Sequence, residues 1–287
     1  MSAQAVAQSA HAPLLRLEQV GMRFSGLLAV DALDFSVEAG QVVGLIGPNG
    51  AGKTTVFNMI TGVYRPTAGR ILWQGREITG APPHRVAALG ICRTFQTIRL
   101  FAGLSVRENV QAGLHLQTRQ QWWQALLGTP AQRREEAAQL AQVHALLERL
   151  DLAHCADENA TSLPYGLQRR VELARALIAK PRLLILDEPA AGLNDQESLD
   201  LNRTILSIRD SGVTVLLVEH DMNVVMNVTD RIVCISFGRK IAEGAPEQIR
   251  NDPKVIEAYL GKDDDEDETR AESDTIASAA GAQGAPA

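Results

Sequence analysis

The fold of this chain is decided by Gly47-Pro48-Asn49-Gly50-Ala51-Gly52-Lys53-Thr54-Thr55. The run matches G-x-x-x-x-G-K-[ST], a loop whose backbone N–H groups surround phosphate, and it joins an apolar strand-like segment (41–46) to a helical one (53–60). Glycines let the backbone curl around the β-phosphate, and the following helix N-terminus adds its positive dipole end. Lys53 can then reach the β- and γ-phosphates, and the Thr54 hydroxyl can hold Mg²⁺. The alternative is a glycine-rich turn that merely links strand to helix, but this context favours a nucleoside triphosphate.

Length and composition bound the rest of the molecule. A chain of 287 residues fits one large α/β domain or two small ones, and 45% hydrophobic residues support a core. No apolar run approaches the roughly 20 residues that a membrane span needs. The first thirteen residues lack the basic start of a signal peptide and are predicted to form a flexible leader. We therefore expect a cytosolic protein, or one bound to a membrane only through a partner.

The charge is unevenly distributed along the chain. The net charge is −6, and residues 262–287 carry two basic and eight acidic residues, so this tail accounts for all of it. The remaining residues, 1–261, have no net charge, which disfavours a protein dedicated to binding nucleic acid. The tail is predicted to be disordered, with a binding role as the alternative. Cys92, Cys155 and Cys234 lack paired or metal-ligand spacing and are predicted to be reduced thiols.

The pattern along the chain predicts a strand-rich core interrupted by a helical insertion. Apolar residues recur at helical spacing between 104 and 180, as in Ala138, Ala141, Leu146 and Leu150. The runs 182–186 and 213–218 are apolar on both faces, as in a parallel sheet covered by helices. The other predicted strands are 14–20, 33–37, 41–46, 70–73, 91–95 and 231–236, with a hairpin tip at 238–239 leading into 240–243. Short helices are predicted at 171–179 and 255–260.

Two strand ends carry polar residues that suit phosphate chemistry. Asp187 ends an apolar strand, where a carboxylate can reach the Mg²⁺ of a phosphate loop, and Glu188 follows it, placed to polarise an attacking water. The alternative is an acidic pair that simply ends a strand before Pro189. His220 follows another apolar strand, and by itself such a histidine is more often structural.

The phosphate loop, the Ile185–Pro189 run, His220 and the helical insertion together resemble the ATP-binding cassette (ABC) ATPases over about residues 14–261. The resemblance implies an α/β fold, with a RecA-like parallel-sheet core, an antiparallel β subdomain and a helical insertion. It implies a leader (1–13), a single ABC ATPase domain (14–261) and a disordered acidic tail (262–287). Within the domain the core is 14–96 and 181–261, and the insertion is about 97–180.

The resemblance also implies roles for individual residues. Gln96 matches the Q-loop glutamine, His220 the switch histidine, and Phe24 the aromatic residue that stacks on adenine, although the residues alone favour a buried core phenylalanine. The implied catalytic residues are Lys53, Gln96, Glu188 and His220. The implied Mg²⁺ ligands are Thr54, Gln96 and Asp187. The implied ATP-binding residues are Phe24, Gly47, Pro48, Asn49, Gly50, Ala51, Gly52, Lys53, Thr54 and Thr55. The implied D-loop is Ala191, Gly192, Leu193, Asn194 and Asp195.

One motif departs from the family pattern. The family signature Leu-Ser-Gly-Gly-Gln, which one subunit supplies to the ATP of another, corresponds here to Leu163-Pro164-Tyr165-Gly166-Leu167-Gln168. Pro164 lacks the serine hydroxyl and a backbone N–H, and Tyr165 replaces a glycine where the backbone approaches phosphate. The chain's own phosphate loop is complete, whereas the half that it donates is altered. We therefore expect a heterodimer with a second, different ATP-binding subunit.

Finer resemblance points to the ATP-binding subunits of bacterial branched-chain (hydrophobic) amino acid importers. It rests on Met22-Arg23-Phe24, Arg93-Thr94-Phe95-Gln96, Arg99-Leu100-Phe101, Glu219-His220-Asp221-Met222 and Ala258-Tyr259-Leu260-Gly261. The resemblance implies ATP and Mg²⁺ as cofactors, two membrane permeases and an external solute-binding protein as partners, and no nucleic acid. It places the chain at the cytoplasmic face of the inner membrane, held there through the permeases. A permease helix is expected to dock near 99–108, and Trp122-Trp123 either contact the permease or are buried.

Other functions remain as alternatives. The transported solute could instead be urea, an amide or another amino acid, because this subunit does not contact it. A soluble ABC ATPase acting on nucleic acid or ribosomes usually carries two cassettes in one chain. A P-loop kinase or GTPase predicts an acceptor site or the motif Asn-Lys-x-Asp, which the sequence lacks. The expected enzyme is therefore an ATPase coupled to transport across a membrane.

Overall fold

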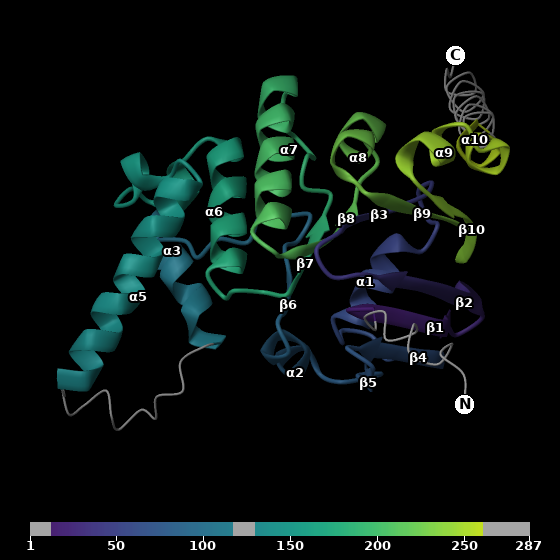
Figure 1. Ribbon diagram of the computed structural model, residues 1–287, viewed down its shortest axis with the longest axis horizontal. Helices are drawn as coiled ribbons and strands as arrows, with labels where there is room; N and C mark the ends of the chain where they lie inside the picture. Colours follow the sequence, from purple (N-terminus) through teal and green to yellow (C-terminus); the bar gives the residue numbers. More distant parts are fainter. Residues whose placement is uncertain (1–12, 117–129, 261–287) are drawn as a thin grey trace, which may run out of the picture.

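Two β-sheets and a set of helices form the protein (Figure 1). The structure is a computed structural model that describes residues 13–116 and 130–260. The predicted acidic tail, Gly261, Trp122-Trp123 and all but the last residue of the predicted leader lie outside the described residues. Within these two ranges, no helix has the length and apolar character needed to span a membrane.

The larger sheet has the strand order β10-β9-β3-β8-β7-β6, and all of its pairings are parallel except the one between β10 and β9. Every residue of its central strands β3, β7 and β8 is buried, as the unbroken apolar runs predict. The turn into β10 is at Phe237-Gly238, beside the predicted hairpin tip. The strands are β3 (Val42–Ile46), β6 (Ile91–Arg93), β7 (Leu183–Asp187), β8 (Thr214–Val218), β9 (Arg231–Ser236) and β10 (Arg239–Gly244).

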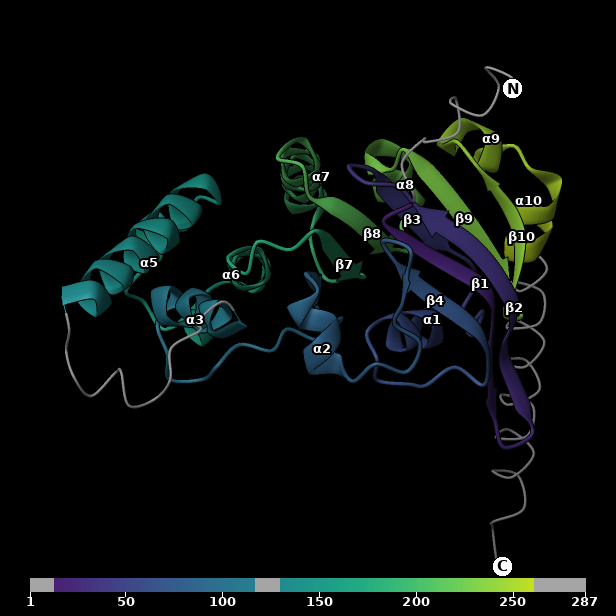
Figure 2. The same ribbon diagram turned by 60° about the horizontal axis from the view of Figure 1, so that its bottom comes forward.

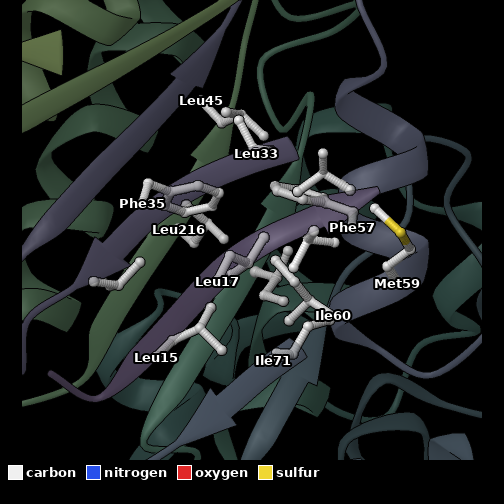
Figure 3. Close-up of a cluster of buried hydrophobic side chains, with 14 of the residues drawn as sticks. Leu15, Leu17, Leu33, Phe35, Leu45, Phe57, Met59, Ile60, Ile71 and Leu216 are labelled. Atoms are coloured by element: carbon white, nitrogen blue, oxygen red, sulfur yellow. The ribbon is translucent and has the colours of Figure 1, made fainter. Parts of the chain in front are cut away.

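The smaller sheet is antiparallel, with the order β2-β1-β4-β5, and it encloses one helix against the larger sheet. Figure 3 shows this core, in which Phe57 and Ile60 from the helix meet Leu17 and Ile71 from the strands and Leu216 from the larger sheet. Burying each of these side chains stabilises the fold by about 1.5–3 kcal/mol. The elements are β1 (Leu15–Phe24), β2 (Leu27–Val37), β4 (Ala68–Trp73), β5 (Arg76–Glu77) and α1 (Lys53–Ile60).

The opposite face of the larger sheet is covered by helices (Figure 1). Successive side chains of β7 point to opposite faces of the sheet. Leu183 and Ile185 pack toward α1, whereas Leu184 and Leu186 pack toward α7 and α8. A strand buried on both faces therefore needs apolar residues at every position. The helices on this face are α7 (Asp195–Asp210), α8 (Met222–Val228), α9 (Pro246–Arg250) and α10 (Pro253–Leu260).

The helical insertion lies at one end of the molecule with its own core (Figure 2). Its long helix has apolar residues at the predicted helical spacing, but not all of them are buried. Ala138 and Ala141 are exposed, whereas Val143, Leu147 and Leu150 are buried. These three larger side chains form the face that packs against the neighbouring helices. The helices here are α3 (Val106–Ala112), α5 (Pro130–Arg149) and α6 (Tyr165–Leu177), and α2 (Pro83–Ala88) lies between the insertion and the smaller sheet.

Several boundaries differ from the predicted ones, and β2 begins at Leu27 rather than at 33. Strand β1 continues to Phe24, because an antiparallel partner, β2, begins three residues later and pairs with it. Strand β6 ends at Arg93 rather than at 95. Helix α6 begins at Tyr165 rather than at 171, since Pro164 takes the N-cap position, where a missing N–H costs nothing. Residues 165–168 of the altered signature therefore form the first turn of a helix.

Candidate functional site

The phosphate loop follows β3 directly and leads into α1 at Lys53. Its glycines are required by close approach. A Cβ at Gly47 would lie 2.1 Å from the carbonyl oxygen of Ile235, and one at Gly52 would lie 2.6 Å from that of Ala29. Gly52 also has φ +102, a conformation that side chains disfavour. The N-cap of α1 is Gly52, which has no side chain to hydrogen-bond the first turn of the helix.

Lys53 lies inside this loop. Its Nζ donates to the carbonyl oxygens of Gly47 (2.6 Å) and Pro48 (3.1 Å), and the side chain is buried. Thr54 is exposed in the first turn of α1, and Thr55 is half-buried behind it. The ammonium group therefore lies against the backbone of the loop, and Thr54 is open to solvent beside it.

Asp187 is the last residue of β7 and is held by a cation that the sequence analysis missed. Arg93 Nη2 donates to Asp187 Oδ2 at 2.6 Å, and Nη1 donates to Asn58 Oδ1 at 2.7 Å. The guanidinium also faces the rings of Phe57 and Phe95 at 5.5 and 5.3 Å. No local pattern in the sequence points to this pair, because it depends on β6, which ends at Arg93, lying next to β7 in the sheet.

Glu188 is brought together with Gln96 and His220. Gln96 Nε2 donates to Glu188 Oε2 at 2.6 Å, and His220 Nδ1 lies 3.9 Å from the same oxygen. These residues follow β6, β7 and β8, whose carboxyl ends meet at one edge of the sheet. Three of the four predicted catalytic side chains therefore lie together.

Glu219 is a fully buried carboxylate behind this group. Its Oε1 accepts from the Ala190 N–H at 2.7 Å, and its Oε2 accepts from the His220 N–H at 3.2 Å. Burial raises the pKa of Glu219, and the backbone N–H of Ala190 opposes that rise. The residue ties the start of the D-loop to the loop that carries His220.

Arg169 is a second cation that the sequence analysis did not single out. It is buried in α6 and donates to backbone carbonyls of Phe95, Gln96 and Glu188, at 2.8, 3.1 and 3.0 Å. The signal in the sequence is the pair Arg169 and Glu172, three residues apart on a helix between apolar neighbours.

Phe24 is at the end of β1 and is 37% exposed, so the alternative of a buried core phenylalanine is wrong. Its ring meets that of Tyr64 edge-on, with the centroids 5.3 Å apart. An exposed aromatic face suits stacking on a base.

The altered signature and the D-loop contact each other within the chain. Tyr165 is 43% exposed, and a Cβ at Gly192 would lie 3.2 Å from its ring. Gln168 Nε2 donates to the carbonyl oxygens of Leu163 (2.8 Å) and Thr161 (3.2 Å), so this side chain turns back to its own loop. At the far end of the D-loop, Asn194 caps α7.

A mostly apolar groove of about 350 Å³ separates the core from the helical insertion beside Gln96. Arg99 lies over the Phe95 ring at 4.9 Å, and Arg175 lies over the Phe101 ring at 5.4 Å. Phe101 is 52% exposed, which leaves an aromatic surface uncovered at one rim. The groove is lined by Val63, Val86, Phe95, Phe101, Gly113 and Ala176, among others.

Tyr259 on α10 connects the C-terminal motif to the phosphate loop. It packs beside the cluster formed by Ile46, Ile232 and Cys234. Burial raises the pKa of its hydroxyl to about 12. No group in the described ranges makes a hydrogen bond of standard geometry with this hydroxyl.

The sequence matches two known protein families. Residues 30–191 match the ABC transporter family, and residues 239–265 match a family described as branched-chain amino acid ATP-binding cassette transporter. The chain is 48% identical to BraF of Pseudomonas aeruginosa and 46% identical to LivG of Escherichia coli strain K12. Both are named high-affinity branched-chain amino acid transport ATP-binding proteins. Each alignment covers 87% of this chain and 98% of the relative.

Solved structures show the same fold. A nucleotide-free ATP-binding cassette from an ABC transporter superposes with a TM-score of 0.74 at 32% identity, covering 86% of this chain and 99% of that one. The ADP conformation of MJ1267, also an ATP-binding cassette, gives 0.75 at 31% identity, covering 87% and 99%. The predicted architecture of parallel core, antiparallel subdomain and helical insertion is confirmed.

Proposed function

The chain belongs to the ABC transporter family, and from that premise we propose that it is the ATP-hydrolysing subunit of an importer for branched-chain amino acids. Members of this family are ATPases coupled to transport, and the fold binds nucleotide. The relatives' printed names, and the match of the C-terminal segment, support branched-chain amino acids as the solute. One observation in the site carries the proposal. Glu188 is held between Gln96 and His220 at the sheet edge where β3 enters the phosphate loop.

In the proposed mechanism each group has one task. Lys53 and the N–H groups of the loop bind the β- and γ-phosphates, and Phe24 stacks on adenine. Glu188 accepts a hydrogen bond from the attacking water and orients it, while the Gln96 amide holds the carboxylate in place. His220 lies close enough to Glu188 to contact the γ-phosphate beside it.

The described residues fit a bound Mg²⁺ ion. Thr54, Asp187 and Gln96 offer hydroxyl, carboxylate and amide oxygens, which are the ligands that Mg²⁺ prefers. When bound, the ion would neutralise charge on the β- and γ-phosphate oxygens. Asp187 is paired with Arg93 here, so the guanidinium must share or release that carboxylate for the ion.

The proposed partners follow from the two exposed surfaces near the site. A second, different ATP-binding subunit would supply an ordinary signature to this phosphate loop, because Pro164 and Tyr165 replace the serine and a glycine in this chain. One of two permeases would dock in the groove beside Gln96, and a solute-binding protein would act on the other side of the membrane. The chain would therefore lie at the cytoplasmic face of the inner membrane, with no nucleic acid involved.

Uptake by cells tests this function. In a strain lacking this chain, we expect uptake of labelled leucine to be lost and uptake of labelled urea to be unchanged. The wild-type chain should restore leucine uptake, and the Glu188→Gln variant should not, because a neutral amide lacks the negative charge that polarises the attacking water. Glu257→Gln, an exposed acid on α10, is the matched control and should restore uptake. Loss of urea uptake with leucine uptake intact would instead select the alternative solute.

A further inference from the structure

Arg169 joins three backbone carbonyls that come from two separate segments. Its Nη1 donates to Phe95 O (2.8 Å), and its Nη2 donates to Gln96 O (3.1 Å) and Glu188 O (3.0 Å). The residue is 3% exposed. The segments lie 73–74 and 19 residues away from it in the sequence. One side chain therefore connects α6 to both backbones that carry the Gln96–Glu188 hydrogen bond.

The geometry requires an arginine. A guanidinium is planar and carries five N–H donors in a fixed fork, so it can bridge carbonyls that diverge. A lysine ammonium on a single flexible stem presents its donors from one atom and cannot span the same set. The position also has a fixed counter-charge, because Arg169 Nη1 donates to Glu172 Oε2 at 3.0 Å and Glu172 is itself buried.

A buried ion pair is a poor way to stabilise a helix. Removing both charges from water costs several kcal/mol per ion, and apolar residues of similar volume are often as stable or more so. Arg169 therefore contributes more to the placement of the carbonyls than to the stability of α6. The carbonyl of Glu188 matters most, since Glu188 has φ +46 and its backbone needs external support.

Helix α6 also begins at the altered signature. Tyr165 is its first residue, and Arg169 follows one turn later, about 6 Å along the axis. A helix moves as a rigid element over that distance. A displacement of the signature therefore reaches the guanidinium, and through it the peptide groups of Gln96 and Glu188.

We propose that Arg169 is a positioning residue. It fixes the backbones of Gln96 and Glu188 relative to α6, the helix that begins at the signature. Movement of the helical insertion thereby changes the placement of the Glu188 carboxylate. This inference rests on the proposed function, because it takes Glu188 to be the group that orients water. It goes beyond that function by assigning the mechanical link to one side chain.

The Arg169→Lys variant in the purified transporter complex tests the link. We expect kcat for ATP hydrolysis to fall about ten- to hundredfold, because misplacement of a reacting group by about 1 Å has effects of that size. KM for ATP should stay within about twofold, since the phosphate loop is untouched. Arg170→Lys is the matched control: the side chain is 29% exposed and its nearest acids are 3.5 and 3.6 Å away. Its kcat should stay within about twofold of wild type.

A second variant separates positioning from folding. Arg169→Met combined with Glu172→Leu removes the buried charge pair without leaving either charge alone, so the variant should stay folded while losing the carbonyl bridge. We expect the same loss of kcat as in Arg169→Lys. Wild-type kcat in a folded double variant, or in Arg169→Lys, would overturn the inference. Glu188→Gln is assayed alongside: if it retains turnover, the proposed role of Glu188 is wrong. If Glu188→Gln is inactive and the Arg169 variants are active, the failure belongs to Arg169 alone.

Discussion

Glu188 illustrates how much of the site depends on single residues. Its backbone is left-handed, with φ +46, a conformation that costs a non-glycine residue about 1–3 kcal/mol. The conformation is held on both sides, because its N–H donates to Val218 O at 2.9 Å and its carbonyl accepts from Arg169. The side chain is then directed toward Gln96. These two backbone hydrogen bonds offset the conformational cost at Glu188 and fix the position of its carboxylate.

The three cysteines are free thiols, as predicted, and two of them lie in strands of the larger sheet. Burial raises the pKa of Cys92 to about 11 and that of Cys234 to about 12. A thiol whose pKa is raised on folding stabilises the fold below the ordinary thiol pKa. That contribution is lost as the pH rises from about 8.5, where the unfolded chain ionises, toward the folded value.

We therefore predict that the native protein reacts slowly with a thiol reagent at pH 8. The thiolate is the reactive species, and at pH 8 it is scarce both at the half-buried Cys92 and at the buried Cys234. Labelling of Cys92 and Cys234, followed by mass spectrometry of the peptides, should be at least about tenfold slower in buffer than in denaturant. Labelling at equal rates in the two conditions would contradict the burial of these strands.

Helix α3 shows why a charged residue near the groove does not always report on docking. Glu108 forms a capping box with Ser105: its carboxylate accepts from the Ser105 N–H at 2.7 Å, and its own N–H donates back to the serine. The Ser105 N–H lowers the pKa of Glu108, as does its hydroxyl. Charge reversal at 108 would remove the N3 half of this capping box, so a loss of docking could not be separated from a loss of helix stability.

Arg99 offers a cleaner test of coupling. We predict that Arg99→Glu lowers leucine transported per ATP hydrolysed by about five- to tenfold in reconstituted vesicles, because its guanidinium covers Phe95 at the groove where a permease is proposed to dock. ATP hydrolysis and uptake are measured on the same vesicles. Glu108→Gln is the companion variant, since glutamine preserves a capping box while removing the charge. Unchanged coupling in Arg99→Glu would mean that the permease contacts a different surface.

At the scale of the whole molecule, the phosphate loop is one half of the proposed site. The sequence of this chain contains the phosphate loop, Asp187 and Glu188, which make up one half of an ATP site. At its signature, however, the ring of Tyr165 covers the D-loop glycine Gly192. A second copy would have to place that ring beside the phosphate of the first. The complementary half is therefore proposed to come from a different subunit.

This asymmetry predicts unequal effects of two matched substitutions in the complex. Glu188→Gln should abolish most ATP turnover, because the site in this chain receives an ordinary signature. The same substitution at the catalytic glutamate of the second subunit should leave at least about half of it. Steady-state hydrolysis by the purified complex is the measurement. If turnover survives Glu188→Gln and is lost with the other substitution, the assignment of the two half-sites is reversed.

The sequence by itself determined the phosphate loop, the strand ending in Asp187-Glu188 and the family fold, because each depends on residues close together in the chain. Glycine spacing sets a backbone path locally, and a run of apolar residues sets a buried strand. Apolar periodicity does not mark where a helix begins. Helix α6 begins at Tyr165 because Pro164 takes the N-cap position, and the apolar spacing alone placed its start at 171.

Only the tertiary structure decided which cations serve the site. Arg93 reaches Asp187 across 94 residues, and Arg169 reaches Phe95 across 74. These pairings arise because β6 lies beside β7 in the sheet and α6 packs behind both loops. Strand order and helix packing result from the free energy of burying the whole core. No local stretch of sequence determines this total free energy. The residues that surround Glu188 are therefore known only from the assembled fold.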